Sequence, residues 1–99
     1  MDEDVIEVIR YFGPRKKIIY VHFRDIIGGP AKFTETFHDN GKTSMLAALK
    51  AYQEVGFDGP ITPDHVPHMV DDTPWGHRAR AYAIGYMRAL MEACGIEET

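Results

Sequence analysis

Two segments of the chain carry side chains that could bind a divalent metal ion. His22 lies within the apolar stretch 18–23, and Asp64 and His65 follow the apolar stretch 60–62. A neutral imidazole and a carboxylate suit Mn²⁺, Fe²⁺ or Zn²⁺, whereas Ca²⁺ takes more oxygen ligands than these segments concentrate. We therefore interpret His22 and Asp64 as candidate ligands of one metal ion, although the chain has no HExxH or CxxC spacing.

Each of these polar residues also has a purely structural interpretation. His22 could be an imidazole that is hydrogen-bonded within a core, and Asp64 could accept hydrogen bonds from the loop backbone after a proline. His38 precedes a predicted turn, where contact with a ligand and simple turn packing are equally plausible. His68 and His77 lie near acidic residues and are expected on the surface. The pairing of His22 with a carboxylate one strand later favours the metal hypothesis.

The hydrophobic pattern predicts the element order α-β-α-β-α, which would bring these side chains together. The predicted elements are a helix over 3–12, strands over 17–24 and 60–64, a short extra strand over 32–37, and helices over 44–55 and 78–94. The strand, helix, strand order predicts parallel strands joined by a right-handed crossover, and ligands of such folds gather at the carboxyl ends of the strands. His22 and Arg24 would lie at one such end, and Asp64 and His65 at the next.

The first predicted strand, 17–24, is nearly continuously apolar, as strands covered on both faces are. Successive side chains of a strand point to opposite faces. One face would then carry Tyr20, His22 and Arg24, and the other Ile19, Val21 and Phe23. The face with Tyr20, His22 and Arg24 would need polar partners.

Composition limits the class of protein and its partners. With 44% hydrophobic and 26% charged residues, residues 1–99 are expected to form a single folded unit. The net charge of −4 and the lack of a basic cluster beyond 15–17 argue against a nucleic-acid partner. No apolar stretch approaches the roughly 18 residues of a membrane span. Cys94 is the single cysteine, so no intrachain disulfide can form, and a cytoplasmic location is the expectation.

Length sets a further limit on the fold. A complete eightfold β/α barrel, or TIM barrel, typically has about 250 residues. This chain has 99. It is therefore either a small, different fold or part of a barrel.

Several ordered blocks of the sequence carry a resemblance to a known family. They are Tyr20–Asp25, Glu35–Gly41, Gly56–Ile61, Pro63–His65 and Ala83–Arg88. Together they resemble the carboxyl-terminal part of mannonate dehydratase, and the likeness spans nearly the whole chain. The resemblance implies a partial (β/α)8 TIM barrel of the xylose-isomerase-like superfamily. It also implies a lyase that uses Mn²⁺ or Fe²⁺ to dehydrate D-mannonate to 2-dehydro-3-deoxy-D-gluconate in hexuronate breakdown.

The same resemblance suggests a role for individual residues. His22 and Asp64 resemble metal ligands of the family, and His65 resembles its catalytic histidine. Arg24 and His38 would bind substrate by orienting its acid and hydroxyl groups. The other metal ligands of the family, a histidine and a cysteine from earlier strands, have no counterpart in this chain.

Two positions differ from the family pattern, and other functions remain open. Thr62 stands where family members commonly have arginine. Trp75 stands where they often have a tyrosine that transfers protons, and His77 could take over that role.

One alternative function is that of a sugar isomerase or epimerase of the same barrel class. Another is a noncatalytic unit that binds another barrel or itself. The open strand edges of a partial barrel predict self-association or a complementary barrel portion as partner.

Overall fold

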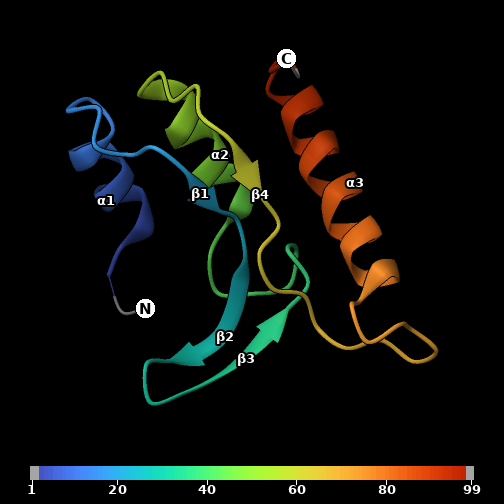
Figure 1. Ribbon diagram of the computed structural model, residues 1–99. Helices are drawn as coiled ribbons and strands as arrows, with labels where there is room; N and C mark the ends of the chain where they lie inside the picture. Colours follow the sequence, from blue (N-terminus) through green and yellow to red (C-terminus); the bar gives the residue numbers. More distant parts are fainter. Residues whose placement is uncertain (1–2, 98–99) are drawn as a thin grey trace.

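The computed structural model describes residues 3–97. Its elements are, in chain order, α1 (Val5–Phe12), β1 (Val21–His22), β2 (Asp25–Gly29), β3 (Lys32–Thr36), α2 (Met45–Glu54), β4 (Ile61–Thr62) and α3 (His77–Ala93). Figure 1 shows β1 and β4 side by side in the middle, with α2 behind them, α1 on the left, α3 on the right, and β2 and β3 extending below.

The two central strands form the parallel pair that the sequence predicted. Val21 is paired with Ile61, and His22 with Thr62. The N–H of Val21 donates to the carbonyl of Pro60 at 3.1 Å, and the N–H of Phe23 donates to the carbonyl of Thr62 at 2.8 Å. The fold is therefore α/β with a small parallel sheet.

Both paired strands are shorter than predicted. Residues 17–20, 23–24, 60 and 63–64 are not strand, and β1 and β4 each comprise two residues. The prediction that 17–24 is covered on both faces was also wrong, because the side chain of Ile19 is 80% exposed. The alternation over 21–23 is as predicted, since Val21 and Phe23 are buried and His22 is exposed.

An antiparallel hairpin, β2 and β3, follows β1 directly. The strand over 32–37 was predicted and is found over 32–36, but its partner β2 was missed. Gly28 and Gly29 indicated a loop, because glycine is unfavourable in strand interiors. Gly28 instead adopts φ +112°, which only glycine tolerates well, and Gly29 pairs with Lys32 around a two-residue connection.

The first two helices follow residues whose side chains satisfy free backbone N–H groups. Asp4 accepts from the N–H groups of Ile6 and Glu7, so α1 begins at residue 5 and not at residue 3 as predicted. Of the two residues that the sequence offers as a cap of α2, Thr43 and Ser44, it is Ser44 that accepts from the N–H of Ala47. The third helix begins at 77, one residue earlier than predicted.

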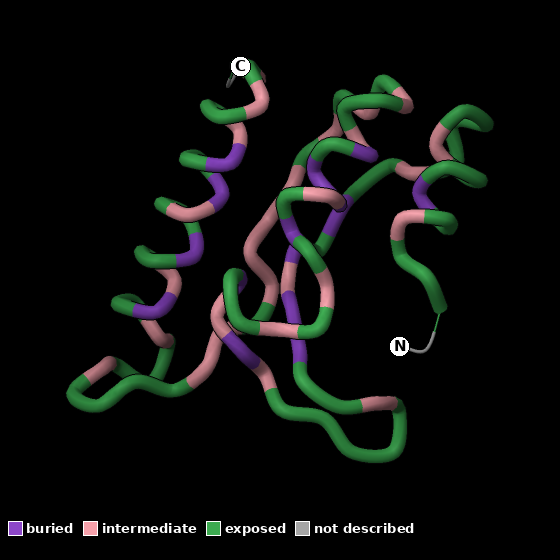
Figure 2. The backbone as a smooth tube through the Cα atoms, turned by 180° about the vertical axis from the view of Figure 1, so that it is seen from behind, coloured by how far each residue is buried: buried purple, intermediate pink, exposed green. Residues whose placement is uncertain are grey.

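The hydrophobic core lies between the parallel pair and the helices. Its buried members are Ile9, Val21, Phe23, Met45, Ala48, Leu49, Ala51, Met87 and Leu90. Figure 2 shows buried positions recurring along one side of α3 and through α2 and the central strands. Among the described residues, no helix is long and apolar enough to cross a membrane.

Candidate functional site

The carboxylate of Asp64 is the centre of a polar cluster at the carboxyl ends of β1 and β4. Its Oδ1 lies 3.2 Å from Nδ1 of His22 and 3.6 Å from Nε2 of His65. Its Oδ2 accepts a hydrogen bond from Nη1 of Arg24 at 3.1 Å. The parallel pairing of the strands thus brings together four residues that the sequence had singled out, from segments some forty positions apart.

Arg24 connects this cluster to the hairpin. Its second terminal nitrogen, Nη2, lies 3.2 Å from Oε1 of Glu35 on β3, so that Arg24 bridges two carboxylates. The Arg24 and Glu35 side chains are only 26% and 21% exposed. Sequence reasoning missed Glu35, because the contact depends on how the hairpin folds back. The predicted role of Arg24 in substrate binding stays a prediction, and its two terminal nitrogens both face protein carboxylates.

The surroundings of Asp64 favour its charged form. Desolvation raises the pKa of this carboxyl group, but hydrogen bonds from His22 and Arg24 and the nearby charge of His65 outweigh it and hold the pKa below its usual value. Asp64 is therefore ionised at neutral pH, as a carboxylate that binds a metal ion must be.

His38, the other predicted substrate-binding residue, lies in the interior. Its side chain is 1% exposed, and Nε2 is hydrogen-bonded to the carbonyl of Phe23. Its Nδ1 is buried and has no hydrogen-bond partner among residues 3–97. In this arrangement His38 supports the end of β1, and direct contact with a substrate stays a prediction.

A buried acid, Asp25, holds the start of the hairpin to the connection before α2. Its Oδ1 accepts from the N–H of Ile26 at 2.9 Å and from the N–H of Thr43 at 3.1 Å. Sequence reasoning did not single it out, although an aspartate directly after a buried strand is a recognisable signal. Asp25 therefore fixes the backbone that follows Arg24.

The loop after β4 ends at a capped helix. Both oxygens of Asp72 accept backbone N–H groups at the start of α3, from Arg78 at 2.9 Å and Ala79 at 3.2 Å. His77 is exposed, as expected, and its Nδ1 lies 2.5 Å from Oγ1 of Thr73. The Trp75 side chain is 75% exposed.

The donor atoms around Asp64 suit a metal ion in kind but not in number. An imidazole nitrogen and a carboxylate oxygen face each other at 3.2 Å, and both are ligands that Mn²⁺ and Fe²⁺ accept. No group of three His, Cys, Asp or Glu side chains within 3–97 is placed to hold a metal ion. A full coordination shell would therefore need ligands from outside this part of the chain.

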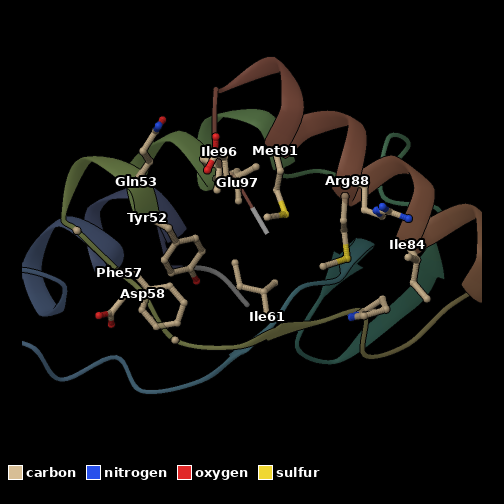
Figure 3. Close-up of a pocket in the computed structure, with 15 residues that line it drawn as sticks. Tyr52, Gln53, Phe57, Asp58, Ile61, Ile84, Arg88, Met91, Ile96 and Glu97 are labelled. Carbon is tan, nitrogen blue, oxygen red and sulfur yellow. The ribbon is translucent and has the colours of Figure 1, made fainter. Parts of the chain in front are cut away.

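A cavity of about 770 Å³ lies elsewhere, between α2 and α3 and next to β4. Figure 3 shows Tyr52, Phe57, Ile61 and Met91 projecting into it. None of the predicted site residues lines it. Its apolar lining distinguishes it from the polar cluster at Asp64.

Comparisons with known proteins agree on one family. The family described as D-mannonate dehydratase (UxuA) matches residues 1–98. Mannonate dehydratase 2 of Halalkalibacterium halodurans is 41% identical over 90 residues, which are 88% of this chain and 25% of that protein. The mannonate dehydratase of Thermotoga petrophila is 34% identical over 92 residues, which are 90% of this chain and 24% of that protein.

A solved structure gives the same result. The crystal structure of mannonate dehydratase from Streptococcus suis serotype 2 superposes with a TM-score of 0.80 at 29% sequence identity, covering 97% of this chain and 30% of that one. The chain thus spans about a quarter of the length of the curated relatives that it matches. Taken together, the family match, the curated relatives and the shared fold show that this chain belongs to the mannonate dehydratase family.

Proposed function

We propose that the chain supplies part of the active site of a mannonate dehydratase, a hydro-lyase that converts D-mannonate to 2-dehydro-3-deoxy-D-gluconate and water in hexuronate breakdown. The observation that carries this proposal is the convergence of His22, Arg24 and His65 on the Asp64 carboxylate. Membership of the family supports the reaction, and the short span of the match supports a partial site.

His22 and Asp64 would hold a divalent metal ion, Mn²⁺ or Fe²⁺, together with ligands from outside the chain. A bound divalent cation lowers the cost of negative charge that develops at the carboxylate end of the substrate. The mutual approach of the His22 nitrogen and the Asp64 oxygen, at 3.2 Å, supports this assignment.

His65 would move protons during the elimination. The reaction removes the proton from the carbon beside the substrate carboxylate, and the hydroxyl group on the next carbon leaves as water. An imidazole can exchange protons near neutral pH, and the His65 side chain is 57% exposed, so that a substrate can reach it. Arg24 would orient the substrate carboxylate, provided that it exchanges one of its present carboxylate partners.

A partial barrel is the architecture that we propose for the chain, as the carboxyl-terminal portion of a (β/α)8 TIM barrel. Two observations support this architecture. The strands β1 and β4 are parallel and are followed by helices, and the polar cluster lies at their carboxyl ends. The single cysteine supports a cytoplasmic setting.

The test compares the chain alone with the chain inside a complete relative. Purified 1–99 with D-mannonate and Mn²⁺ should form no detectable 2-keto product, because its metal shell is incomplete. A chimera, in which this chain replaces the matching quarter of the Halalkalibacterium halodurans protein, should turn over. Robust turnover by 1–99 alone would contradict the partial site, and a folded, metal-loaded but inactive chimera would contradict the function.

Variants of the chimera separate the proposed roles. Asp64→Asn removes the charged oxygen ligand at little steric cost and should lower metal content after gel filtration by at least about tenfold. His65→Asn should lower kcat by a factor on the order of 100 with metal content kept, because its role is proton transfer. Equal metal loss in both variants would show that this division of roles is wrong.

A further inference from the structure

We propose that Arg80 is a positioning residue that holds the Asp64–His65 segment against β1 by binding the main chain on both sides of the site loop. This inference rests on the proposed function, since it concerns the geometry of the same site. Arg80 lies in the first turn of α3 and is partly buried.

The contacts of Arg80 reach two separate stretches of the loop. Nη1 donates to the carbonyl of Asp64 at 2.8 Å and lies 3.4 Å from the carbonyl of Pro63. Nε donates to the carbonyl of Trp75 at 2.8 Å. One guanidinium group thus ties the beginning of the loop after β4 to its end, where α3 starts.

Asp64 is consequently fixed at both its side chain and its backbone. Arg24, which follows β1, binds the carboxylate, and Arg80 from α3 binds the carbonyl of the same residue. With β4 ending at Thr62, no strand hydrogen bonds continue to Asp64, so that its position depends on these two arginines.

The site requires an arginine because it needs donors that point in two directions. The planar guanidinium presents Nε and Nη1 in a rigid arrangement, whereas the ammonium of lysine is a single point of charge on a flexible stem. Lysine at position 80 would keep the charge and the helix but could not bridge the carbonyls of Asp64 and Trp75 together. Arg80→Lys therefore removes the bridge while it changes little else.

The test uses NMR on the full 99-residue chain without metal. In the wild type, the His22 ring protons should show nuclear Overhauser contacts to the β-protons of Asp64, and the Arg80 Nε–H should show scalar coupling across its hydrogen bond to the Trp75 carbonyl. Arg80→Lys should lose the His22–Asp64 contacts while the backbone shifts of α2 and α3 are kept. Arg78→Lys, an exposed position in the same helical turn, is the matched control and should keep those contacts.

Each outcome decides the proposal. His22–Asp64 contacts that survive in Arg80→Lys would overturn it, and so would absence of the coupling in the wild type. A melting temperature for Arg80→Lys far below that of Arg78→Lys would show a general role in stability and would also overturn it. Equal melting temperatures with loss of the contacts in Arg80→Lys alone would support positioning.

A Mn²⁺ titration separates this inference from the proposed function. Mn²⁺ should broaden the resonances of His22 and Asp64 in the wild type, and Arg80→Lys should need about ten times more Mn²⁺ for the same effect. No broadening in the wild type would contradict the proposed metal ligands. The contacts measured without metal would then still decide the role of Arg80.

Discussion

The charged groups of the site contact the Asp64 carboxylate, and Arg24 pairs with both Asp64 and Glu35. Arg24 faces Glu35 at 3.2 Å and Asp64 at 3.1 Å, in a setting where the three side chains are between 21% and 26% exposed. The loss of one partner from a partly buried ion pair destabilises the fold, because the remaining charge is neither fully solvated nor paired. Loss of the arginine would leave two carboxylates facing each other.

We expect Arg24 and Glu35 to be energetically coupled. Arg24→Gln should destabilise the chain more than Glu35→Gln, because the arginine has two carboxylate partners and the glutamate has one. A double-mutant cycle on the free energy of unfolding in urea should give a coupling energy of about 1 kcal/mol. A coupling energy indistinguishable from zero would contradict the bridge.

The sequence identified the residues of this site that carry recognisable chemistry, and it missed those that support them. His22 and Asp64 could be predicted because strand ends and ligand types are local features. Glu35 and Arg80 could not be predicted, because their contacts depend on how a hairpin and a helix fold back onto the strand ends. Arginine and glutamate are also common on surfaces, so their identity alone indicates nothing.

At the scale of elements, helices were easier to predict than strands. The apolar periodicity and the capping Ser44 located α2 almost to the residue, because helical hydrogen bonds are local. The bounds of β1 and β4 were harder to predict, because they depend on where two segments that are distant in the sequence pair with each other. β2 was missed because its glycines are typical of a loop, whereas Gly28 uses its freedom to turn a hairpin.

Two glycine substitutions should have opposite effects on stability. Gly85 lies inside α3 with open space around a built Cβ atom, so Gly85→Ala should raise the free energy of unfolding by about 0.5–1 kcal/mol. In Gly28→Ala, the new Cβ would lie 2.4 Å from the carbonyl oxygen of Lys32 at a φ of +112°, and stability should fall. Urea unfolding checks both, and a shift of the same sign in the two variants would contradict the hairpin geometry.

The cap of α3 should make stability depend on pH. Hydrogen bonds from the backbone, that of Arg78 foremost, lower the pKa of Asp72 and exceed the opposing effect of desolvation. Because the folded pKa is below the unfolded value of about 3.9, the stabilisation is present above that pH and is lost as pH falls through the folded pKa. The melting temperature should fall in that window, and Asp72→Asn should show a flatter dependence. Identical pH profiles for the two proteins would contradict the cap.

The whole molecule covers its apolar surface incompletely. The radius of gyration is 13.8 Å, close to the roughly 13 Å of a compact 100-residue domain, but the shape is flat, with extents of 42, 34 and 20 Å. Large apolar side chains that remain exposed include Val8, Tyr11, Phe12, Ile19, Tyr20, Phe33, Val70 and Ile84. Among the described residues, β1 and β4 pair only with each other, so each leaves one edge open.

We therefore expect the isolated chain to self-associate. Open strand edges and exposed apolar side chains both favour pairing with another strand, from a second copy or from a complementary barrel portion. Light scattering across a concentration series should show a mass that rises above 11.2 kDa. A monomer at every concentration, with a sharp cooperative melt, would contradict the partial-barrel proposal.

The exposure of Trp75 affects how unfolding of this protein can be observed. The sequence has a single tryptophan, and its indole is already 75% in solvent in the folded chain. Its fluorescence therefore reports on the loop that Arg80 holds and changes little when the core around Phe23 and Leu49 opens. Tryptophan emission will then follow the opening of this loop, and far-ultraviolet circular dichroism will follow the loss of the helices. A mismatch between the two unfolding curves would therefore report the local opening of the loop and not a partly folded core.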